Sequence, residues 1–474
     1  KMNKKSLLLI LLCFILMLTG CSNGAPSYTD FVIPKGDESS LVPVDSYKTS
    51  QQKTYTNEGI TPTYIAEYKS ENELCSIIVY KEYYDVTLDY ENGTPGEVGT
   101  AYAEMILKAF PDYPKIMEPY IYENIRVAFG GNTYEASAVE ERMYTLFESL
   151  DKRYKEELSG YAGRISGGIH GFNEDGVLSY EEAIIIQMVP DALRPTSCSA
   201  LSLWGDKTES GKPITLRVLE WSLGSENQLG FVNAVTHFKN GDKSFTSIGM
   251  LGLFDIISAI NDDGVFAAIL DVGSVSQMPF VSEGKKCYTF DIRHALEMYK
   301  NAKDVGSYIV ENSGDYTFCH NLIITDENSS YCAENCVKEV SDAGKGFSIL
   351  RDENTPIMNG ISWDSRDSLC VVNSYAAKGN QDGFAGNENN IVRWAKYNQL
   401  VSGKDKFSVT DVKNLITGEK VNQYDVVNIH SSGTVDLIIV DYETGNIQVA
   451  FTRTEGVIDK PDFIDVGTYY RNEE

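Results

Sequence analysis

The chain has 474 residues, of which 42% are hydrophobic and 11% aromatic, so it can bury a sizeable core. Acidic side chains (68) outnumber basic ones (41) and give a formal net charge of −27 at pH 7. A surface of this charge repels nucleic-acid phosphates and anionic lipid headgroups, which argues against nucleic-acid binding. The length exceeds what one core usually holds, so we expect one large domain preceded by a prosegment.

The amino terminus has the pattern of a bacterial export signal. Two lysines precede an apolar run over 7–18, which is short for a permanent membrane-spanning helix. The run ends in Leu-Thr-Gly-Cys at Cys21, which resembles the lipobox of bacterial lipoproteins. We predict a signal peptide over 1–20, lipidation of Cys21 and a tether over 21–63. The protein would then be lipid-anchored on the outer side of the cytoplasmic membrane or secreted; an uncleaved anchor or an ordinary signal peptide is the alternative.

The next elements show strand and then helix patterns. Residues 75–90 are rich in β-branched and aromatic side chains, which predicts a strand that stops at the turn formers from 91 onward. Apolar spacing predicts helices over 101–110 and 136–158. A further helix should open at Ser179, because Ser179 to Glu182 has the form of a capping box, and should end before Pro190.

Past Cys198 the pattern changes to short strands separated by turns. Helices are expected between groups of strands, over 253–260, 292–302 and 389–400. Sequential strands joined mostly by turns predict a largely antiparallel sheet assembly covered by helices, which is an α+β fold. The expected strands cover 215–221, 231–237, 245–248, 265–271, 321–326, 369–373, 435–441 and 447–452.

Seven cysteines follow Cys21, and an odd number in an exported protein suggests at least one free thiol. Cys332 and Cys336 lack a second pair at zinc-site spacing, so we predict no metal and no cofactor.

The sequence around Cys198 does not have the context of a papain-type nucleophile. A cysteine can instead use its own α-amino group as a base, once the peptide bond before it is cut.

The segment that begins at Cys198 resembles a known family. The run Cys198-Ser-Ala-Leu-Ser-Leu-Trp-Gly-Asp206 is followed by Arg217-Val-Leu-Glu220-Trp, where the family has Arg-Asn-Leu-Asp-Trp. This is similar to the acyl-coenzyme A:6-aminopenicillanic acid acyltransferases, relatives of choloylglycine hydrolases and penicillin V acylases. The similarity extends from about residue 83 to about residue 451. It implies the four-layer αββα sandwich of the N-terminal-nucleophile hydrolases, with a largely helical prosegment over 64–197 and a catalytic domain over 198–474.

The resemblance also implies roles for single residues. Cleavage after Ser197 would free Cys198 as the nucleophile, Arg217 would hold its thiolate, and Glu220 would accept from the new α-ammonium. Asn261, in a stretch that resembles Gly-Met-Asn-Glu-Lys-Gly-Leu, and Asn373 would contribute to an oxyanion hole. Arg393 would be a late active-site arginine.

These roles predict hydrolysis of a linear amide carbon–nitrogen bond through a thioester, with a small acyl amide as substrate and an acyl transfer to another amine as the variant. A cysteine peptidase acting on short peptides and a catalytically inactive binding lipoprotein of the same fold are the alternatives.

One geometric condition is set by the spacing of Arg217 and Glu220. Residues three apart lie on opposite faces of a regular strand, so both serve one site only if the strand bulges or ends there.

Overall fold

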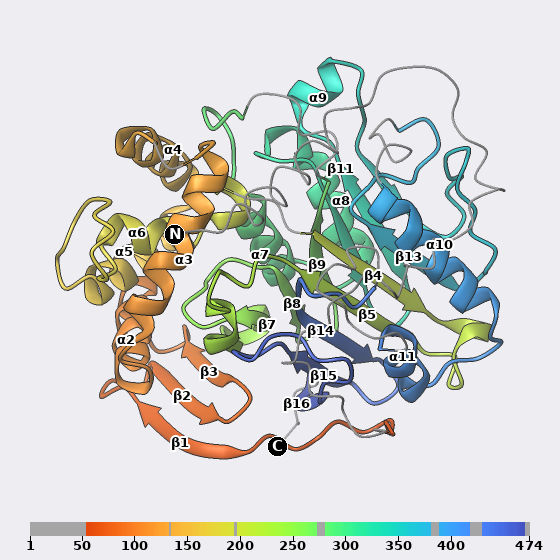
Figure 1. Cartoon of the computed structure of the whole chain (residues 1–474), viewed down its shortest axis with the longest axis horizontal. Coiled ribbons are helices and arrows are strands. Elements are labelled where there is room, and N and C mark those ends of the chain that lie inside the picture. Colours follow the sequence, from red (N-terminus) through yellow and green to blue (C-terminus); the bar gives the residue numbers. More distant parts are fainter. Residues whose placement is uncertain are drawn as a thin grey trace, which may run out of the picture.

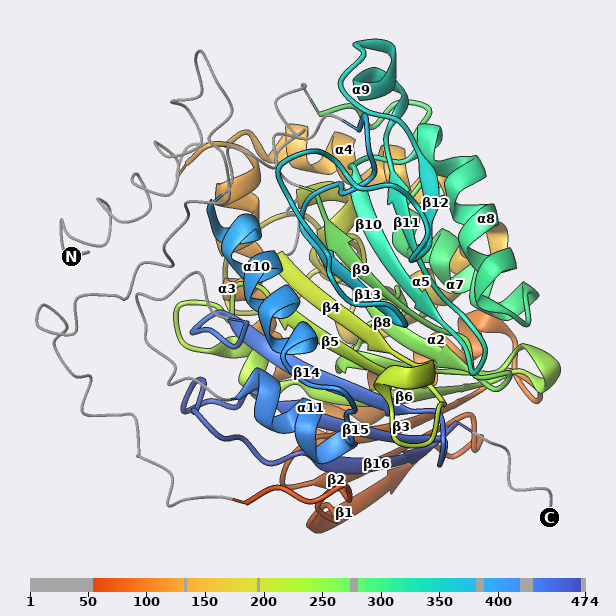
Figure 2. The same cartoon turned by 90° about the vertical axis from the view of Figure 1, so that its right-hand side faces the viewer.

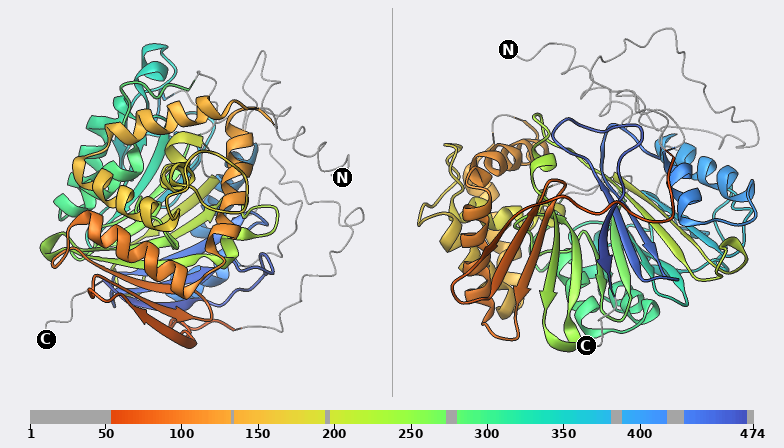
Figure 3. Two further views of the ribbon diagram at one scale, coloured as in Figure 1. Left: turned by 90° about the vertical axis from the view of Figure 1, so that its left-hand side faces the viewer. Right: turned by 90° about the horizontal axis from the view of Figure 1, so that it is seen from below.

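The computed structural model describes residues 54–131, 134–193, 197–272, 280–380, 388–417 and 429–469. The predicted signal peptide, Cys21 and most of the tether lie outside these residues. Two β-sheets face each other, and helices cover their outer faces (Figures 1 and 3). This is the α+β four-layer sandwich expected from the sequence, so the predicted fold class is confirmed. Among the described residues, no helix has the length and apolarity needed to cross a membrane.

The large sheet has ten strands in the order β1-β2-β3-β6-β7-β8-β9-β10-β11-β12. The pairing of β3 with β6 is parallel, and the other ladders between its named strands are antiparallel. Its strands are β1 (Tyr64–Lys69), β2 (Cys75–Tyr80), β3 (Tyr84–Asp89), β6 (Asn233–Lys239), β7 (Phe245–Met250), β8 (Ser258–Asn261), β9 (Phe266–Asp271), β10 (His320–Thr325), β11 (Ser330–Asn335) and β12 (Ile349–Arg351).

The small sheet has six antiparallel strands in the order β13-β4-β5-β14-β15-β16. Hydrogen bonds between side chains connect it to the large sheet, such as Ser202 Oγ with Ser330 Oγ at 2.7 Å. The two inner faces therefore form one continuous interior. Its strands are β4 (Ser197–Leu203), β5 (Ile214–Glu220), β13 (Ser368–Val372), β14 (Thr434–Asp441), β15 (Asn446–Phe451) and β16 (Ile464–Thr468).

Helices cover both outer faces. Figure 2 shows α10 and α11 over the small sheet, while α2, α7 and α8 pack on the large sheet. Many begin at residues suited to a helix start: Thr94 and Glu97 form a capping box with Pro95 in the first turn of α2. The helices are α2 (Pro95–Ala109), α3 (Tyr113–Ala128), α4 (Ala136–Ser149), α5 (Lys152–Ile165), α6 (Tyr180–Ile186), α7 (Tyr288–Met298), α8 (Ala302–Asn312), α9 (Lys338–Asp342), α10 (Glu388–Ser402) and α11 (Val409–Ile416).

Most elements expected from the sequence are present. All eight strands predicted past Cys198 are found within two residues of their expected ends. The capping box at Ser179 is confirmed, since Glu182 N donates to Ser179 Oγ at 3.1 Å and Ser179 N donates to Glu182 Oε2 at 2.8 Å. The predicted helix over 389–400 is α10.

Other expectations need correction. The predicted strand over 75–90 is the β2–β3 hairpin, and the helical stretches over 136–158 and 292–302 are each divided between two helices. The helix predicted over 253–260 is wrong, because this stretch enters the interior and ends in β8. A short apolar run that is buried on all sides has the same sequence pattern whether it is helix or strand.

The segment 64–197 is joined to the rest of the fold by sheet pairing. Its three strands extend the large sheet through the parallel β3–β6 ladder, which runs from Tyr84 opposite Ala234 to Asp89 opposite Lys239. Its helix α5 is fixed to α7 by buried Arg293, whose Nη1 lies 2.7 Å from Glu157 Oε2. The predicted boundary after Ser197 falls at the first residue of β4.

Candidate active site

Cys198 is the second residue of β4, and its side chain belongs to the interior between the two sheets. It pairs with Leu219 on β5, and the next pair on the same face is Ala200 with Arg217. Cys198 and Arg217 are both 0% exposed. The strand register thus brings a thiol and a guanidinium together in a site that excludes bulk water.

Arg217 is shared between the thiol and a buried carboxylate. Its Nη2 donates to Cys198 Sγ at 3.4 Å and to the carbonyl oxygen of Ile269 at 3.3 Å. Its Nη1 lies 3.7 Å from Oδ1 of Asp436 on β14. Burial raises the pKa of Asp436 to about 6, and the charge of Arg217 opposes the rise. A fixed cation beside a cysteine favours the thiolate, so Arg217 is placed to activate Cys198.

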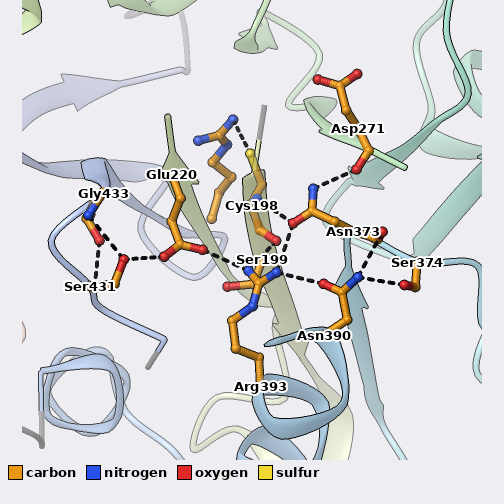
Figure 4. A network of polar contacts seen from close by, with 12 residues as sticks. Cys198, Ser199, Glu220, Asp271, Asn373, Ser374, Asn390, Arg393, Ser431 and Gly433 are labelled. Atoms are coloured by element: carbon orange, nitrogen blue, oxygen red, sulfur yellow. Dashed lines mark hydrogen bonds and ion pairs between the residues drawn. The ribbon is translucent and has the colours of Figure 1, made fainter. Parts of the chain in front are cut away.

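Asn373 follows β13 and holds the backbone nitrogen of Cys198 (Figure 4). Its Oδ1 accepts from Cys198 N at 2.6 Å and from Arg393 Nη2 at 2.9 Å. Its Nδ2 donates to the carbonyl oxygen of Asp271 at 2.7 Å. Two donors on one side and an acceptor on the other fix the orientation of the amide. Its oxygen therefore faces the atom that would become the α-amino group after cleavage.

Arg393 on α10 reaches the same residue from the helix layer. Its Nη1 donates to the carbonyl oxygen of Cys198 at 2.6 Å and to Glu220 Oε2 at 2.8 Å. Asn390, one turn earlier on α10, accepts from Arg393 Nη2 at 2.8 Å. The side chain is 0% exposed, so these partners compensate for the burial of its charge.

Glu220 lies on the opposite face of β5 from Arg217, as their spacing requires. Its strand ends there, and its carboxylate accepts from Arg393 and from Ser431 Oγ. Burial raises the pKa of Glu220, and Arg393 and Ser431 oppose the rise. Glu220 thus acts on Cys198 through Arg393, while the acceptor in hydrogen-bond contact with Cys198 N is Asn373. Arg217 and Glu220 therefore both act on Cys198, although they lie on opposite faces of β5.

Asn261 lies elsewhere, so its predicted oxyanion role is wrong. Its Nδ2 donates to the carbonyl oxygens of Leu296 (2.9 Å) and Tyr299 (3.0 Å), and its Oδ1 accepts from Val265 N (2.9 Å). These bonds close the β8–β9 turn against the end of α7. The site lies at the other end of β9, beside Asp271, and a strand of this length spans roughly 16–20 Å. The stretch that suggested the role is a structural turn.

Several residues of the site were not found from the sequence. Asp436, Asn390 and Ser431 each contact a predicted site residue, and Asp271 supplies the carbonyl oxygen that orients Asn373. A weak signal existed for two of them. Asn390 precedes Arg393 by three residues, which places both on one side of a helix. Asp436 directly precedes the apolar run over 437–440 of β14. In the described part of the chain, no group of three or more His, Cys, Asp or Glu side chains could hold a metal ion.

No protein-family model and no curated protein matches the chain. Solved structures similar to it include an ortholog of N-acylethanolamine-hydrolyzing acid amidase from Caenorhabditis elegans, at 10% identity and a TM-score of 0.33, covering 51% of this chain and 92% of that chain. A variant of conjugated bile acid hydrolase from Clostridium perfringens matches at 13% identity and a TM-score of 0.33, covering 54% and 89%. A second mutant of that hydrolase matches at 12% identity and a TM-score of 0.34, covering 58% and 95%.

Proposed function

We propose that the chain hydrolyses a linear amide bond with Cys198 as nucleophile, through a thioester acyl-enzyme. The observation that carries this proposal is the convergence of three polar side chains on one buried cysteine. Arg217 contacts its sulfur, Asn373 its backbone nitrogen and Arg393 its carbonyl oxygen. A cysteine that only fills space needs no such partners, because burying arginine costs free energy unless its charge is paired.

The reaction has two halves. The α-amino group of Cys198 takes the proton of its own thiol, and the thiolate attacks the amide carbonyl carbon. The α-ammonium then gives this proton to the departing amine as the carbon–nitrogen bond breaks. Water attacks the thioester while the amino group takes a proton from it, the carbon–sulfur bond breaks, the sulfur regains the proton, and the acid leaves. Negative charge on the carbonyl oxygen needs fixed donors, and Nε and Nη1 of Arg217 have no hydrogen-bond partner among the described residues.

The free α-amino group requires cleavage between Ser197 and Cys198, which we include in the proposal. Cys198 Sγ would attack the Ser197 carbonyl carbon, and the peptide nitrogen would take a proton as its bond to that carbon breaks. Water would hydrolyse the resulting thioester and leave Cys198 as the first residue of a new chain. In the uncut chain Cys198 is buried. Cleavage would create the base that this mechanism requires.

Replacement of Cys198 tests the proposal. We expect Cys198→Ala to stop cleavage, seen as one intact mass, and to lower hydrolysis of acyl 4-nitroanilides by roughly 10³-fold or more. Cys75→Ala, a buried cysteine on β2 far along the chain from the site, is the matched control and should keep both properties. A Cys198→Ala protein that still hydrolyses the amides at the wild-type rate would rule the mechanism out.

Export and anchoring form a separate part of the proposal and depend on the sequence of the first 21 residues. A lipidated Cys21 would hold the enzyme on the outer side of the cytoplasmic membrane. Expression in bacteria with a radioactive fatty acid should label the wild-type chain and not Cys21→Ala. Equal labelling of the two proteins would contradict lipidation at this position.

A further inference from the structure

Two cysteines lie opposite each other at one end of the β10–β11 hairpin. Strand β10 begins at His320, which pairs with Asn335, the last residue of β11. Cys319 and Cys336 are the next residues outward on the two strands. Continuation of the same register therefore places them directly opposite each other, with both side chains on one face of the sheet.

The backbone bonds of the two cysteines show which kind of pair they form. The carbonyl oxygen of Cys319 accepts from Val272 N at 3.0 Å, on the β9 side, and Cys336 N donates at 2.9 Å to Oγ of Ser348, directly before β12. Their backbone groups thus point away from each other, as in a non-hydrogen-bonded pair. The Cα atoms of such a pair are about 4.5 Å apart, within the range of about 4.4–6.8 Å that a disulfide needs.

The two free thiols are already in contact. Cys319 Sγ accepts from Val337 N at 3.5 Å, and Cys336 Sγ lies 3.7 Å from the carbonyl oxygen of the same residue. The hydrogen bond between the two thiols lowers the pKa of Cys319 and raises the pKa of Cys336. A thiolate at Cys319 is therefore favoured over one at Cys336, and the thiolate is the form that reacts with disulfides.

This end of the hairpin supports the segment that carries Asn373. The hydroxyl of Tyr375 donates to the carbonyl oxygen of Asn335, and it also contacts both thiols. Asn321 Nδ2 on β10 donates to the carbonyl oxygens of the residues on either side of Asn373, both at 2.9 Å. The position of Asn373 thus depends on the strand ends where the two cysteines lie.

We infer that Cys319 and Cys336 form a disulfide, which closes the end of the β10–β11 hairpin beside the segment that carries Asn373. The proposed export would place the chain in an oxidising environment, where disulfides persist. Formation of this bond does not require the proposed amide hydrolysis.

The oxidant is a disulfide donor, such as oxidised glutathione or a thiol–disulfide oxidoreductase. The thiolate of Cys319 attacks one donor sulfur, the donor disulfide breaks, and one donor thiol leaves. Cys336 then loses its proton and attacks Cys319 Sγ, so that the mixed disulfide breaks and the second donor thiol leaves. Two protein thiols are oxidised to one disulfide, and the donor disulfide is reduced to two thiols, which take up the two protons.

Cys332 provides a comparison within the same strand. It is also buried and lies on the same face of β11, but the residue opposite it on β10 is Ile323. It precedes Cys336 by four residues, which is about 13 Å along a strand. Cys332 is therefore too far from Cys319 to form a disulfide with it while the sheet is intact.

Oxidation of the purified full chain tests the inference. The protein is equilibrated with mostly oxidised glutathione, unfolded in the presence of iodoacetamide, and digested after glutamate, which places Cys319, Cys332 and Cys336 in three separate peptides. We expect the peptides of Cys319 and Cys336 to be linked, with the mass of the two thiol peptides less two hydrogen atoms, and Cys332 to be alkylated. Cys198→Ala should give the same link, so loss of amide hydrolysis and loss of the disulfide are separate outcomes.

Unfolding in urea measures the effect of the bond on the fold. The midpoint for the oxidised chain should lie at higher urea than that for the reduced chain, because the cross-link restricts the unfolded state. Cys336→Ala should remove the difference between the two conditions, and Cys332→Ala is the matched control that should keep it. Alkylation of both Cys319 and Cys336 after oxidation, a link that includes Cys332, or equal midpoints in the wild type overturns the inference.

Discussion

The guanidinium of Arg217 is held between two acids of different strength, the Cys198 thiol and the Asp436 carboxyl. When Asp436 is ionised, it neutralises part of the positive charge that stabilises the thiolate. When Asp436 is protonated, the whole charge acts on the sulfur. With the pKa of Asp436 raised to about 6 by burial, this change falls just below neutral pH. The Cys198 thiol and the Asp436 carboxyl therefore share one cation, so the charge state of Asp436 should influence the thiol.

Asp436→Asn removes the competing charge. We expect alkylation of Cys198 by iodoacetamide in the cut chain to extend about one unit further toward acid, since the cation then acts on the thiolate alone. Peptide mass analysis after timed exposure at a series of pH values measures this. An unfolding curve controls for stability, because an unpaired buried arginine is costly. A profile identical to that of the wild type would show that Asp436 does not influence the thiol.

Replacement of Asn373 tests the hydrogen bond to the backbone nitrogen of Cys198. Asn373→Ala removes the acceptor at Cys198 N and one partner of Arg393, and we expect activity to fall about 10²–10³-fold, as for loss of one positioned active-site group. Asn398→Ala, a half-buried asparagine on α10 that donates to Asp364 and not to the site, is the control and should retain wild-type activity. Normal kcat and KM in Asn373→Ala would remove Asn373 from the mechanism.

The sequence identified the residues of the site that lie in recognisable motifs. They come together from β4, the middle and end of β5, the residue after β13 and helix α10: Cys198, Arg217, Glu220, Asn373 and Arg393. Their partners were missed because a contact such as Arg217 with Asp436 depends on which strand lies beside β5, and no local pattern carries that information. Asn261 was misassigned for a related reason, since a turn asparagine and an oxyanion asparagine look alike in sequence.

Among the secondary-structure elements, β10 begins with a buried histidine, His320, that should make the stability of the fold depend on pH. The ring of His320 stacks on Tyr288 with centroids 4.1 Å apart, and its nitrogens contact Asn335 Nδ2 and the carbonyl oxygen of Phe318, both at 3.1 Å. Burial lowers the pKa of His320 to about 4. The folded state therefore holds the neutral ring, and only the unfolded chain takes up a proton between about pH 6.5 and pH 4.

Stability should fall on acidification through this window. Burial of the neutral His320 ring imposes no loss of stability above about pH 6.5. By about pH 4 the free energy of unfolding should be lower by about 3 kcal/mol, because each unit of pKa shift corresponds to about 1.4 kcal/mol. Urea unfolding at several pH values should show a smaller decrease for His320→Gln. His237→Gln, whose ring is about one-third exposed, should keep the wild-type slope. Parallel curves for wild type and His320→Gln would contradict the assignment.

Local sequence pattern predicted most elements well, including strands such as β5 and β9 that are buried at every position, but it failed for one short apolar run. Helix α10 and the strands past Cys198 have clear patterns, and they lie where expected. The run over 253–260 is apolar with helical spacing, yet its residues fill the interior around Phe254 and Ile257 and lead into β8. Tertiary burial decides such segments, so the sequence alone could not.

Over the whole molecule, the parallel β3–β6 ladder crosses the proposed cleavage point, because β3 precedes Cys198 and β6 follows it. Buried Arg293 pairs with Glu157 across the same boundary. We therefore expect the segment before Cys198 to remain bound after the cut. Cleaved protein should give two fragments under denaturing conditions and one peak in native size-exclusion chromatography. Separate elution of the fragments without denaturant would show that the first segment is released.

The distance along the chain between Cys198 and its partners has a further consequence. Asn373 and Arg393 lie 175 and 195 residues after Cys198. A ribosome that adds about 5–20 residues per second delivers them roughly 10–40 seconds later. Until then the sulfur has no complete set of neighbours. The topology thus sets an order in which the chain is made at least as far as Arg393 before the proposed cut can take place.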